Sequence, residues 1–338
     1  MPAPLTELEK QTPAPVLPYA APARRALLRR LTGFREFMIL LIIILASIGM
    51  SFASDFFLTS SNILAMLLGV SIESIVAIGM TILMVSGGFD MSVGSTVALT
   101  GAVSAYAMLH GVPVPLAILI GLALGALIGL VNGFIIAKIG INPFITTLGM
   151  MGVIRGILEV VTKGQNIAGL PSSFKTIGQG SLLGIQYPIL IALVLILLGD
   201  LLLRKSRFFR QNYYIGGNEK AALLSGIPVK SITVFNYALT GFLAALAGIV
   251  MTARLGAATV SAGTGLELRV ISAVIIGGAS LQGGEGTVLG AFLGALLMAI
   301  ITGSLTLLGV DVYWNKLVIG ATLLLAVMID TLSKRPRR

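Results

Sequence analysis

Residues 204–230 read RKSRFFRQNYYIGGNEKAALLSGIPVK, a polar and basic stretch in an otherwise strongly apolar chain. We call this stretch the island. Hydrophobic segments of membrane-spanning length lie on both sides of it, since a bilayer core needs roughly 20 apolar residues per helix. The island therefore predicts an exposed loop between two spans. Its basic and helix-forming residues indicate a surface that another protein contacts.

The composition indicates an all-α polytopic membrane protein. Of the 338 residues, 56% are hydrophobic and 11% are charged, too few charges to cover the surface of a soluble fold. We expect about ten transmembrane helices, with glycine-rich segments that are broken or re-entrant. The expected spans are 37–53, 62–85, 92–110, 114–137, 144–162, 186–203, 231–253, 267–282, 286–309 and 315–330.

Charge placement predicts the topology. Residues 1–36 are proline-rich and basic and are expected to form a disordered cytoplasmic tail, residues 37–331 the membrane domain with a cytoplasmic loop at 205–230, and residues 332–338 a basic C-terminal tail. With both termini in the cytoplasm, 17 of the 23 lysines and arginines fall on that side, as the positive-inside rule requires. The net charge of +10 therefore does not indicate nucleic-acid binding.

Glycines recur every fourth residue in two of the expected spans. Such spacing places them on one helix face, where another backbone can approach closely. We expect a helix-packing role for Gly121, Gly125, Gly129, Gly133, Gly286, Gly290 and Gly294. The stretch 87–102 also resembles 277–291, a possible internal repeat whose orientation, parallel or inverted, the sequence leaves open.

Charged residues within the spans are functional candidates, because each is costly to bury in lipid. Glu73 falls near the middle of a span, with structural and functional roles equally open. Asp90 lies in a glycine-rich break, where a helix cap and a role in lining a pathway are both open. Arg155 and Glu159 are four residues apart, a spacing that favours a pair on one helix face.

Within the island, residues 218–228 predict a short helix with defined ends. Asn218 can cap its start, and Glu219 in the first turn complements the helix dipole. Gly226 and Pro228 can end it. A short exposed helix between spans is suited to act as a mechanical lever.

Several classes of chemistry lack support in the sequence. No G-x-x-x-x-G-K-[ST] phosphate loop, G-x-S-x-G elbow or H-E-x-x-H helix occurs. The chain has no cysteine and one histidine, His110, which excludes disulfides, cysteine-based metal or redox sites and multi-histidine metal sites. We expect a non-catalytic chain without a metal site.

Four segments together resemble the ribose-type, or monosaccharide, permeases of bacterial ATP-binding cassette (ABC) importers. GGNEKAALLSGI at 216–227 is similar to the coupling segment of that family, and AGTGLELRVISAVIIGGASLQGGEGTVLGAFLGAL at 262–296 to its C-terminal signature. GGFDMSVGS at 87–95 and INPFITTLGM at 141–150 are similar to two further segments. The resemblance covers about residues 37–330. The match to the general coupling motif of importer permeases is looser, because Lys220 follows Glu219.

The resemblance implies a permease subunit in the bacterial inner membrane that forms the pathway for a sugar. It implies a cytoplasmic ABC ATPase that binds ATP and Mg²⁺ in place of this chain, a periplasmic or lipid-anchored sugar-binding protein, and a second permease chain, identical or closely similar. The ATPase-coupling residues would be Asn218, Glu219, Lys220, Ala221, Ala222, Ser225, Gly226 and Ile227. The pathway residues would be Asp90, Ser92, Asn142, Phe144 and Glu73.

Alternative functions stay open on the sequence alone. A secondary transporter driven by an ion gradient would also have broken helices, although it would not need the lever at 218–226. An importer permease for a non-sugar solute, such as a branched-chain amino acid, is a further alternative. The identity of the sugar cannot be derived, because a binding protein would set most of the selectivity.

Overall fold

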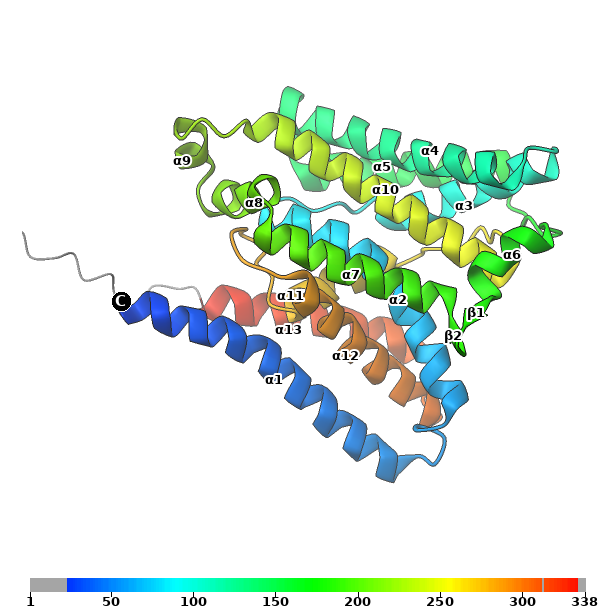
Figure 1. Ribbon diagram of the computed structural model, residues 1–338, viewed down its shortest axis with the longest axis horizontal. Coiled ribbons are helices and arrows are strands. Elements are labelled where there is room, and N and C mark those ends of the chain that lie inside the picture. Colours follow the sequence, from blue (N-terminus) through cyan, green and yellow to red (C-terminus); the bar gives the residue numbers. More distant parts are fainter. Residues whose placement is uncertain (1–22, 312, 334–338) are drawn as a thin grey trace, which may run out of the picture. The chain divides into compact units, whose positions relative to one another are not determined.

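The computed structural model describes residues 23–311 and 313–333, and these are almost entirely helical (Figure 1). Among the described residues two units are distinguished, one that ends at Phe34 and a second that begins at Arg35. The elements in chain order are α1 (Ala23–Ala53), α2 (Ser60–Val85), α3 (Val93–Leu109), α4 (Val114–Phe134), the π-helix η1 (Ile135–Ile139), α5 (Pro143–Thr162), α6 (Ser172–Gln179), β1 (Ser181–Leu182), β2 (Ile185–Gln186), α7 (Tyr187–Lys205), α8 (Arg207–Gly217), α9 (Glu219–Leu224), α10 (Val229–Leu255), α11 (Leu266–Ile276), α12 (Val288–Leu307) and α13 (Tyr313–Ser333). β1 and β2 form a small antiparallel hairpin.

The expected N-terminal tail is only partly open to comparison. Residues 1–22 lie outside the described residues. From Ala23 onward the chain is helical, because α1 begins there and continues to Ala53. The expectation of a disordered tail through residue 36 stays a prediction, and residues 23–36 fall within α1.

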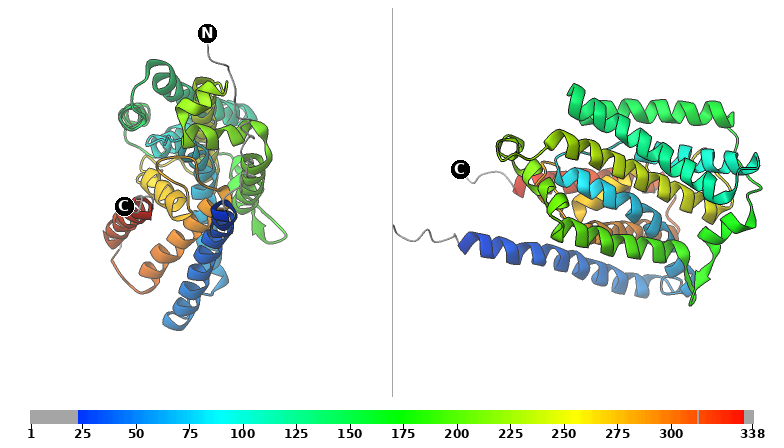
Figure 2. Two further views of the ribbon diagram at one scale, coloured as in Figure 1. Left: turned by 90° about the vertical axis from the view of Figure 1, so that its left-hand side faces the viewer. Right: turned by 45° about the horizontal axis from the view of Figure 1, so that its top comes forward.

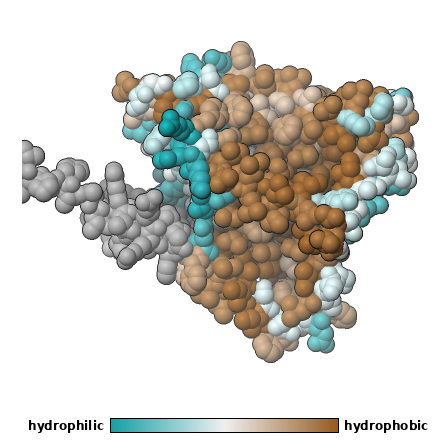
Figure 3. Space-filling model, in the orientation of Figure 1, coloured by the Kyte–Doolittle hydropathy of each residue, from teal (hydrophilic) through white to brown (hydrophobic). Residues whose placement is uncertain are grey.

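The described residues include eight helices that are long and apolar enough to cross a membrane: α1, α2, α4, α5, α7, α10, α12 and α13. Figure 3 shows a continuous apolar face, with polar side chains gathered at two opposite edges. The two other expected spans correspond to shorter helices, α3 with 17 residues and α11 with 11. An all-α polytopic membrane fold is confirmed, while the count of ten spans stays a prediction.

Helices α2 and α10 form the buried centre of the second unit and run antiparallel to one another. α2 ends at Val85, whose carbonyl lies against Gly216 of α8, and α10 begins at Val229, close behind α9. We call the end of the bundle that carries α8 and α9 the island end. Helices α3, α4 and α6 pack on α10, and α7, α8, α11 and α12 pack on α2; Figure 2 gives two further views of these helices.

The packing contacts reveal an inverted internal repeat. α3 packs on α4 and α5, and α11 packs on α12 and α13. α4 packs on α10, and α12 packs in the same way on α2. The pattern is preserved when α2–α5 is exchanged with α10–α13, and the antiparallel course of α2 and α10 makes the two halves inverted.

This pairing differs from the alignment of 87–102 with 277–291 that the sequence suggested. The repeat relates α3 to α11, whereas that alignment relates α3 to α12. The two glycine-rich stretches are similar for another reason, namely close backbone packing. A Cβ on Gly94 would overlap the carbonyl of Gly263, and one on Gly290 would overlap that of Gly277.

The regularly spaced glycines of α4 lie where α4 closely approaches its neighbouring helices. A Cβ on Gly125 would meet the Gly241 carbonyl, on Gly129 the Tyr237 carbonyl, and on Gly133 the backbone of Val234, all on α10. Gly121 lies against Ser104 of α3 and Ile249 of α10. In the other half, Gly294 lies against Ala273 of α11, and Gly286 lies in the turn ahead of α12 with a φ of +145°.

Candidate functional site

Helix α9 presents an exposed surface at the island end. The side chain of Asn218 accepts a hydrogen bond from the Ala221 N–H at 3.0 Å, the expected N-terminal cap. At the other end Gly226 has a φ of +79° and donates its N–H to Leu223 O, while the Ile227 N–H reaches Ala222 O. These two bonds form a Schellman motif, which fixes the six-residue helix although it is too short to be stable alone.

A groove of about 480 Å³ lies between α8 and α9. Its lining includes five of the expected coupling residues, namely Asn218, Ala221, Ala222, Ser225 and Ile227. Beside it Leu224 is 90% exposed and Leu223 51%. Glu219 and Lys220 are exposed as well. Exposed leucines on a polar segment, next to a groove, are typical of a protein-binding surface.

Asp90 and Ser92 form a buried polar cluster with Asn132 of α4. One carboxylate oxygen of Asp90 accepts from both the Ser92 N–H at 2.7 Å and the Ser92 hydroxyl at 2.6 Å, and the other accepts from the Asn132 amide at 3.3 Å. The Met91 N–H donates to Thr147 of α5. These bonds fix the turn that leads into α3. At 2% and 0% exposure, Asp90 and Ser92 are covered by protein rather than presented to a cavity.

Asn142 and Phe144, the other expected pathway residues near this turn, are exposed at the start of α5. Asn142 caps that helix by accepting from the Phe144 N–H at 2.8 Å. The Phe144 ring, 46% exposed, lies 6.2 Å from the ring of Phe89. The turn that holds Asp90 is thus flanked by an aromatic pair with one open face.

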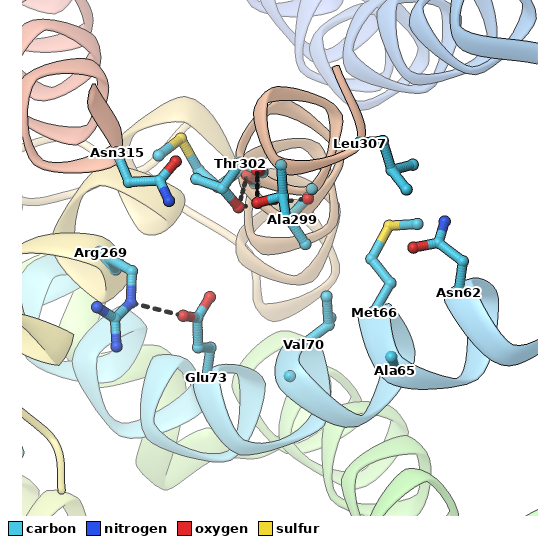
Figure 4. Close-up of a pocket in the computed structure, with 14 residues that line it drawn as sticks. Asn62, Ala65, Met66, Val70, Glu73, Arg269, Ala299, Thr302, Leu307 and Asn315 are labelled. Carbon is cyan, nitrogen blue, oxygen red and sulfur yellow. Dashed lines mark hydrogen bonds and ion pairs between the residues drawn. The ribbon is translucent and has the colours of Figure 1, made fainter. Parts of the chain in front are cut away.

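Glu73 lies at a cavity of about 350 Å³ between α2, α11, α12 and α13 (Figure 4). Its carboxylate forms an ion pair with the guanidinium of Arg269 at 2.7 Å. Asn62 and Thr306 lie farther along the same cavity. α2 begins at the end of the bundle opposite the island end, and the cavity opens there. Glu73 lies thirteen residues farther along α2, which is about 20 Å at a rise of 1.5 Å per residue.

The chemistry of this cavity suits a neutral hydroxylated solute. In Figure 4 the ion pair and the amide of Asn315 converge on the same space. The Asn315 Oδ1 is buried without a partner among the described residues. Carboxylate, guanidinium and amide groups together offer both acceptors and donors, and the volume lies at the lower end of the range for small-molecule sites, roughly 300–1,000 Å³.

Arg155 does not form the expected pair with Glu159. Its guanidinium donates instead to the carbonyls of Val260, at 2.7 Å, and Ala262, at 3.3 Å. These carbonyls belong to the irregular segment 256–265 between α10 and α11, which offers acceptors that a helix surface lacks. A pair of the same spacing, Asp200 and Arg204, does form at 2.7 Å.

Sequence reasoning missed the partners of the two intramembrane carboxylates. Arg269 is 196 residues from Glu73, and its one available signal was a lone arginine in an apolar segment. Nothing in the sequence singled out Asn132 as the partner of Asp90. No group of three histidine or carboxylate side chains that could hold a metal is found within the described part of the chain.

Comparisons with known proteins give a consistent result. A family model described as branched-chain amino acid transport system / permease component matches residues 62–327. The chain is 40% identical over 305 residues to ribose import permease protein RbsC of Bacillus subtilis (strain 168), covering 90% of this chain and 93% of that protein. It is 41% identical over 297 residues to RbsC of Escherichia coli (strain K12), covering 87% and 92%.

More distant relatives are also named as sugar permeases. The L-arabinose ABC transporter permease protein AraH of Azospirillum brasilense is 38% identical over 282 residues, 83% of each chain. The D-allose transport system permease protein AlsC of Escherichia coli (strain K12) is 36% identical over 294 residues, 87% of this chain and 90% of that one. No solved structure matches the chain.

Proposed function

This chain belongs to the ribose-type sugar permeases of ABC importers, multi-pass proteins of the inner membrane, and from that premise we propose how its described parts divide the work. The α8–α9 groove receives a separate cytoplasmic ATPase. The cavity at Glu73 and Arg269 holds the sugar on its way through the membrane. The observation that carries the first assignment is the exposure of apolar α9 residues on an otherwise polar end.

The coupling surface is built for rigid transmission. The cap at Asn218 and the Schellman motif at Gly226 hold α9 as a unit, and the Ala222 side chain packs with Ile215 of α8 and with Ile232 of α10. A displacement of α9 is therefore transmitted directly to α8 and α10. Movement of packed helices as rigid bodies is one of the established modes of conformational switching.

The partners follow from this arrangement. ATP and Mg²⁺ bind to the ATPase subunit, and a periplasmic or lipid-anchored binding protein delivers the sugar at the end opposite the island end. A second permease chain, identical or closely similar, completes the pathway. Both termini and the island lie in the cytoplasm, which requires an even number of spans and agrees with the positive charges of the island.

Two substitutions at one position test the coupling assignment. A Cβ on Gly226 would meet open space, so only its left-handed backbone conformation resists substitution. Gly226→Val is expected to distort α9 and abolish ATP-dependent uptake, whereas Gly226→Asn, which tolerates this conformation, is expected to retain most of it. Both variants are first checked for membrane insertion.

Uptake is measured in proteoliposomes that contain the ATPase and the binding protein. Equal uptake by the two Gly226 variants would refute the coupling role. A wild-type chain that binds no ATPase and transports sugar under an ion gradient alone would refute the importer mechanism.

A cavity substitution tests the sugar assignment separately. Asn315→Leu removes an amide whose Oδ1 has no partner within the part of the chain that the structure describes, so the fold is expected to tolerate it. The variant should raise the sugar concentration needed for half-maximal uptake while leaving ATPase binding unchanged. Unaltered concentration dependence would remove the cavity from the pathway.

A further inference from the structure

Two neighbouring residues of helix α8 make hydrogen bonds to different parts of the bundle. Asn212 and Tyr213 follow one another in sequence, and successive residues of a helix point about 100° apart. Asn212 is fully buried, and Tyr213 is partly buried. Tyr213 bonds directly to the turn ahead of α12 in the second half, whereas Asn212 bonds to Asn236 of α10 and reaches the first half through that residue.

Asn212 connects α8 to α10 and, through α10, to the turn that follows α2 in the first half. Its side-chain carbonyl accepts from the Asn236 amide of α10 at 2.8 Å, and the same amide reaches the Ser86 hydroxyl at 3.4 Å. One residue further on, the Tyr237 hydroxyl donates to the carbonyl of Phe89 at 3.0 Å. This path leads into segment 86–92, the turn ahead of α3.

Tyr213 connects α8 to the second half. Its hydroxyl donates to the Gly286 carbonyl at 2.7 Å, in the turn between α11 and α12. Burial raises the pKa of Tyr213 to about 12, so the hydroxyl keeps its proton at neutral pH. One turn along α8, a Cβ on Gly216 would overlap the backbones of both Val85 and Gly284, and Gly284 donates its N–H to Val85 O at 2.8 Å.

The contact through Asn212 is incompletely hydrogen-bonded. The buried polar atoms without a partner among the described residues include Gln211 Oε1, Asn212 Nδ2 and Asn236 Oδ1. Turning both asparagine amides over would exchange the donor for the acceptor and again leave one atom of each unpaired. Buried polar groups are normally satisfied, so this contact is suited to a joint that exchanges partners between two states rather than to a permanent link.

We propose that Asn212 and Tyr213 form a fork that transmits movement of the island to both halves at once. The inference rests on the proposed coupling of α9 to an ATPase. When α8 moves with α9, Asn212 displaces the turn ahead of α3, and Tyr213 displaces the turn ahead of α12. Because the halves are inverted, one displacement of α8 reaches the turn ahead of α3 in the first half and the turn ahead of α12 in the second.

The test compares three variants of the full chain with the wild type. Tyr213→Phe removes one hydroxyl, Asn212→Ala removes the other branch of the fork, and the third variant combines them. Each is assembled with its ATPase and binding protein in proteoliposomes. The readout is the number of sugar molecules imported per ATP hydrolysed, which a purely structural loss of complex would not change. Tyr187→Phe serves as a control, since the Tyr187 hydroxyl makes no hydrogen bond within the described residues.

Each single variant is expected to lower this ratio about fivefold, as for one lost hydrogen bond in the switching step, with ATPase still bound at wild-type stoichiometry. The double variant should fall further, and the control should match the wild type. Wild-type ratios in both single variants, or a fall only in the amount of assembled complex, would overturn the fork and leave the coupling role of α9 intact. A wild-type chain that binds no ATPase would overturn both.

Discussion

The two inverted halves share their packing but differ in their polar groups. In each half a helix with glycine-lined contacts, α4 or α12, lies against the central helix of the other half, α10 or α2. The first half contributes two carboxylates, Asp90 and Glu73, and Asp90 is satisfied by neutral donors of its own half. The second half contributes Arg269, which pairs across the boundary with Glu73. The helix packing is therefore repeated in the two halves, whereas the ion pair is not.

This difference separates constraints of packing from constraints of function. A backbone contact through glycine depends only on the helix geometry that both halves inherit from the repeat. A charge inside the membrane is costly wherever it lies, so the Glu73–Arg269 pair, which the repeat does not duplicate, indicates a local requirement. The asymmetric groups are therefore the better candidates for contact with the solute.

The largest expected effect tests the shared packing. Gly129→Leu and Gly294→Leu each force a side chain into a neighbouring backbone, at Tyr237 and Ala273 respectively. Overpacking against a backbone should cost about 3 kcal/mol or more, and both variants should fail to accumulate as folded protein in detergent size-exclusion chromatography. Gly149→Leu is the control, because a Cβ there meets open space. Normal accumulation of only one of the two variants would break the equivalence of the halves.

A smaller but still large effect tests the asymmetric ion pair. Glu73→Gln leaves Arg269 unpaired at membrane depth, which is expected to destabilise the protein by about 3–5 kcal/mol. Glu73→Gln combined with Arg269→Gln removes both charges and should regain most of the loss. Thermal unfolding in detergent measures both. A double variant as unstable as the single one would mean that Arg269 has another essential role.

The change at the other carboxylate of the first half should cost less. Asp90→Asn keeps the side-chain shape but replaces one acceptor with a donor facing the Ser92 or Asn132 donors, with an expected loss of about 1–3 kcal/mol. Asp55→Asn, at an exposed aspartate, is the matched control. A loss of stability as large as that of Glu73→Gln would show that the hydrogen bonds to Asp90 from neutral donors stabilise the fold as much as the Glu73–Arg269 ion pair does.

Local signals in the sequence predicted local structure well. The cap at Asn218 and the end of α9 at Gly226 depend on residues within one turn of the helix, and both are present in the structure. The partners of Glu73 and Arg155 were not predicted, because they lie 196 and 105 residues away and are set by tertiary packing. The inverted repeat was obscured because similar glycine stretches serve close packing at positions that the repeat does not relate.

The smallest expected effect concerns the segment ahead of α11. Arg155→Gln loses the charged donors that hold the carbonyls of Val260 and Ala262, and these sites are only partly buried, so global stability should fall by about 1 kcal/mol. The local effect should be larger, because segment 256–265 has little regular structure to hold it. Hydrogen exchange in that segment is expected to accelerate, while exchange in segment 86–92 stays unchanged. Glu159→Gln should leave both segments unaltered, since Glu159 does not hold Arg155. Equal acceleration of exchange by Glu159→Gln would mean that Glu159 does hold Arg155, as the four-residue spacing suggested. Segment 256–265 would then depend on an ion pair within α5 and not on the Arg155 side chain alone.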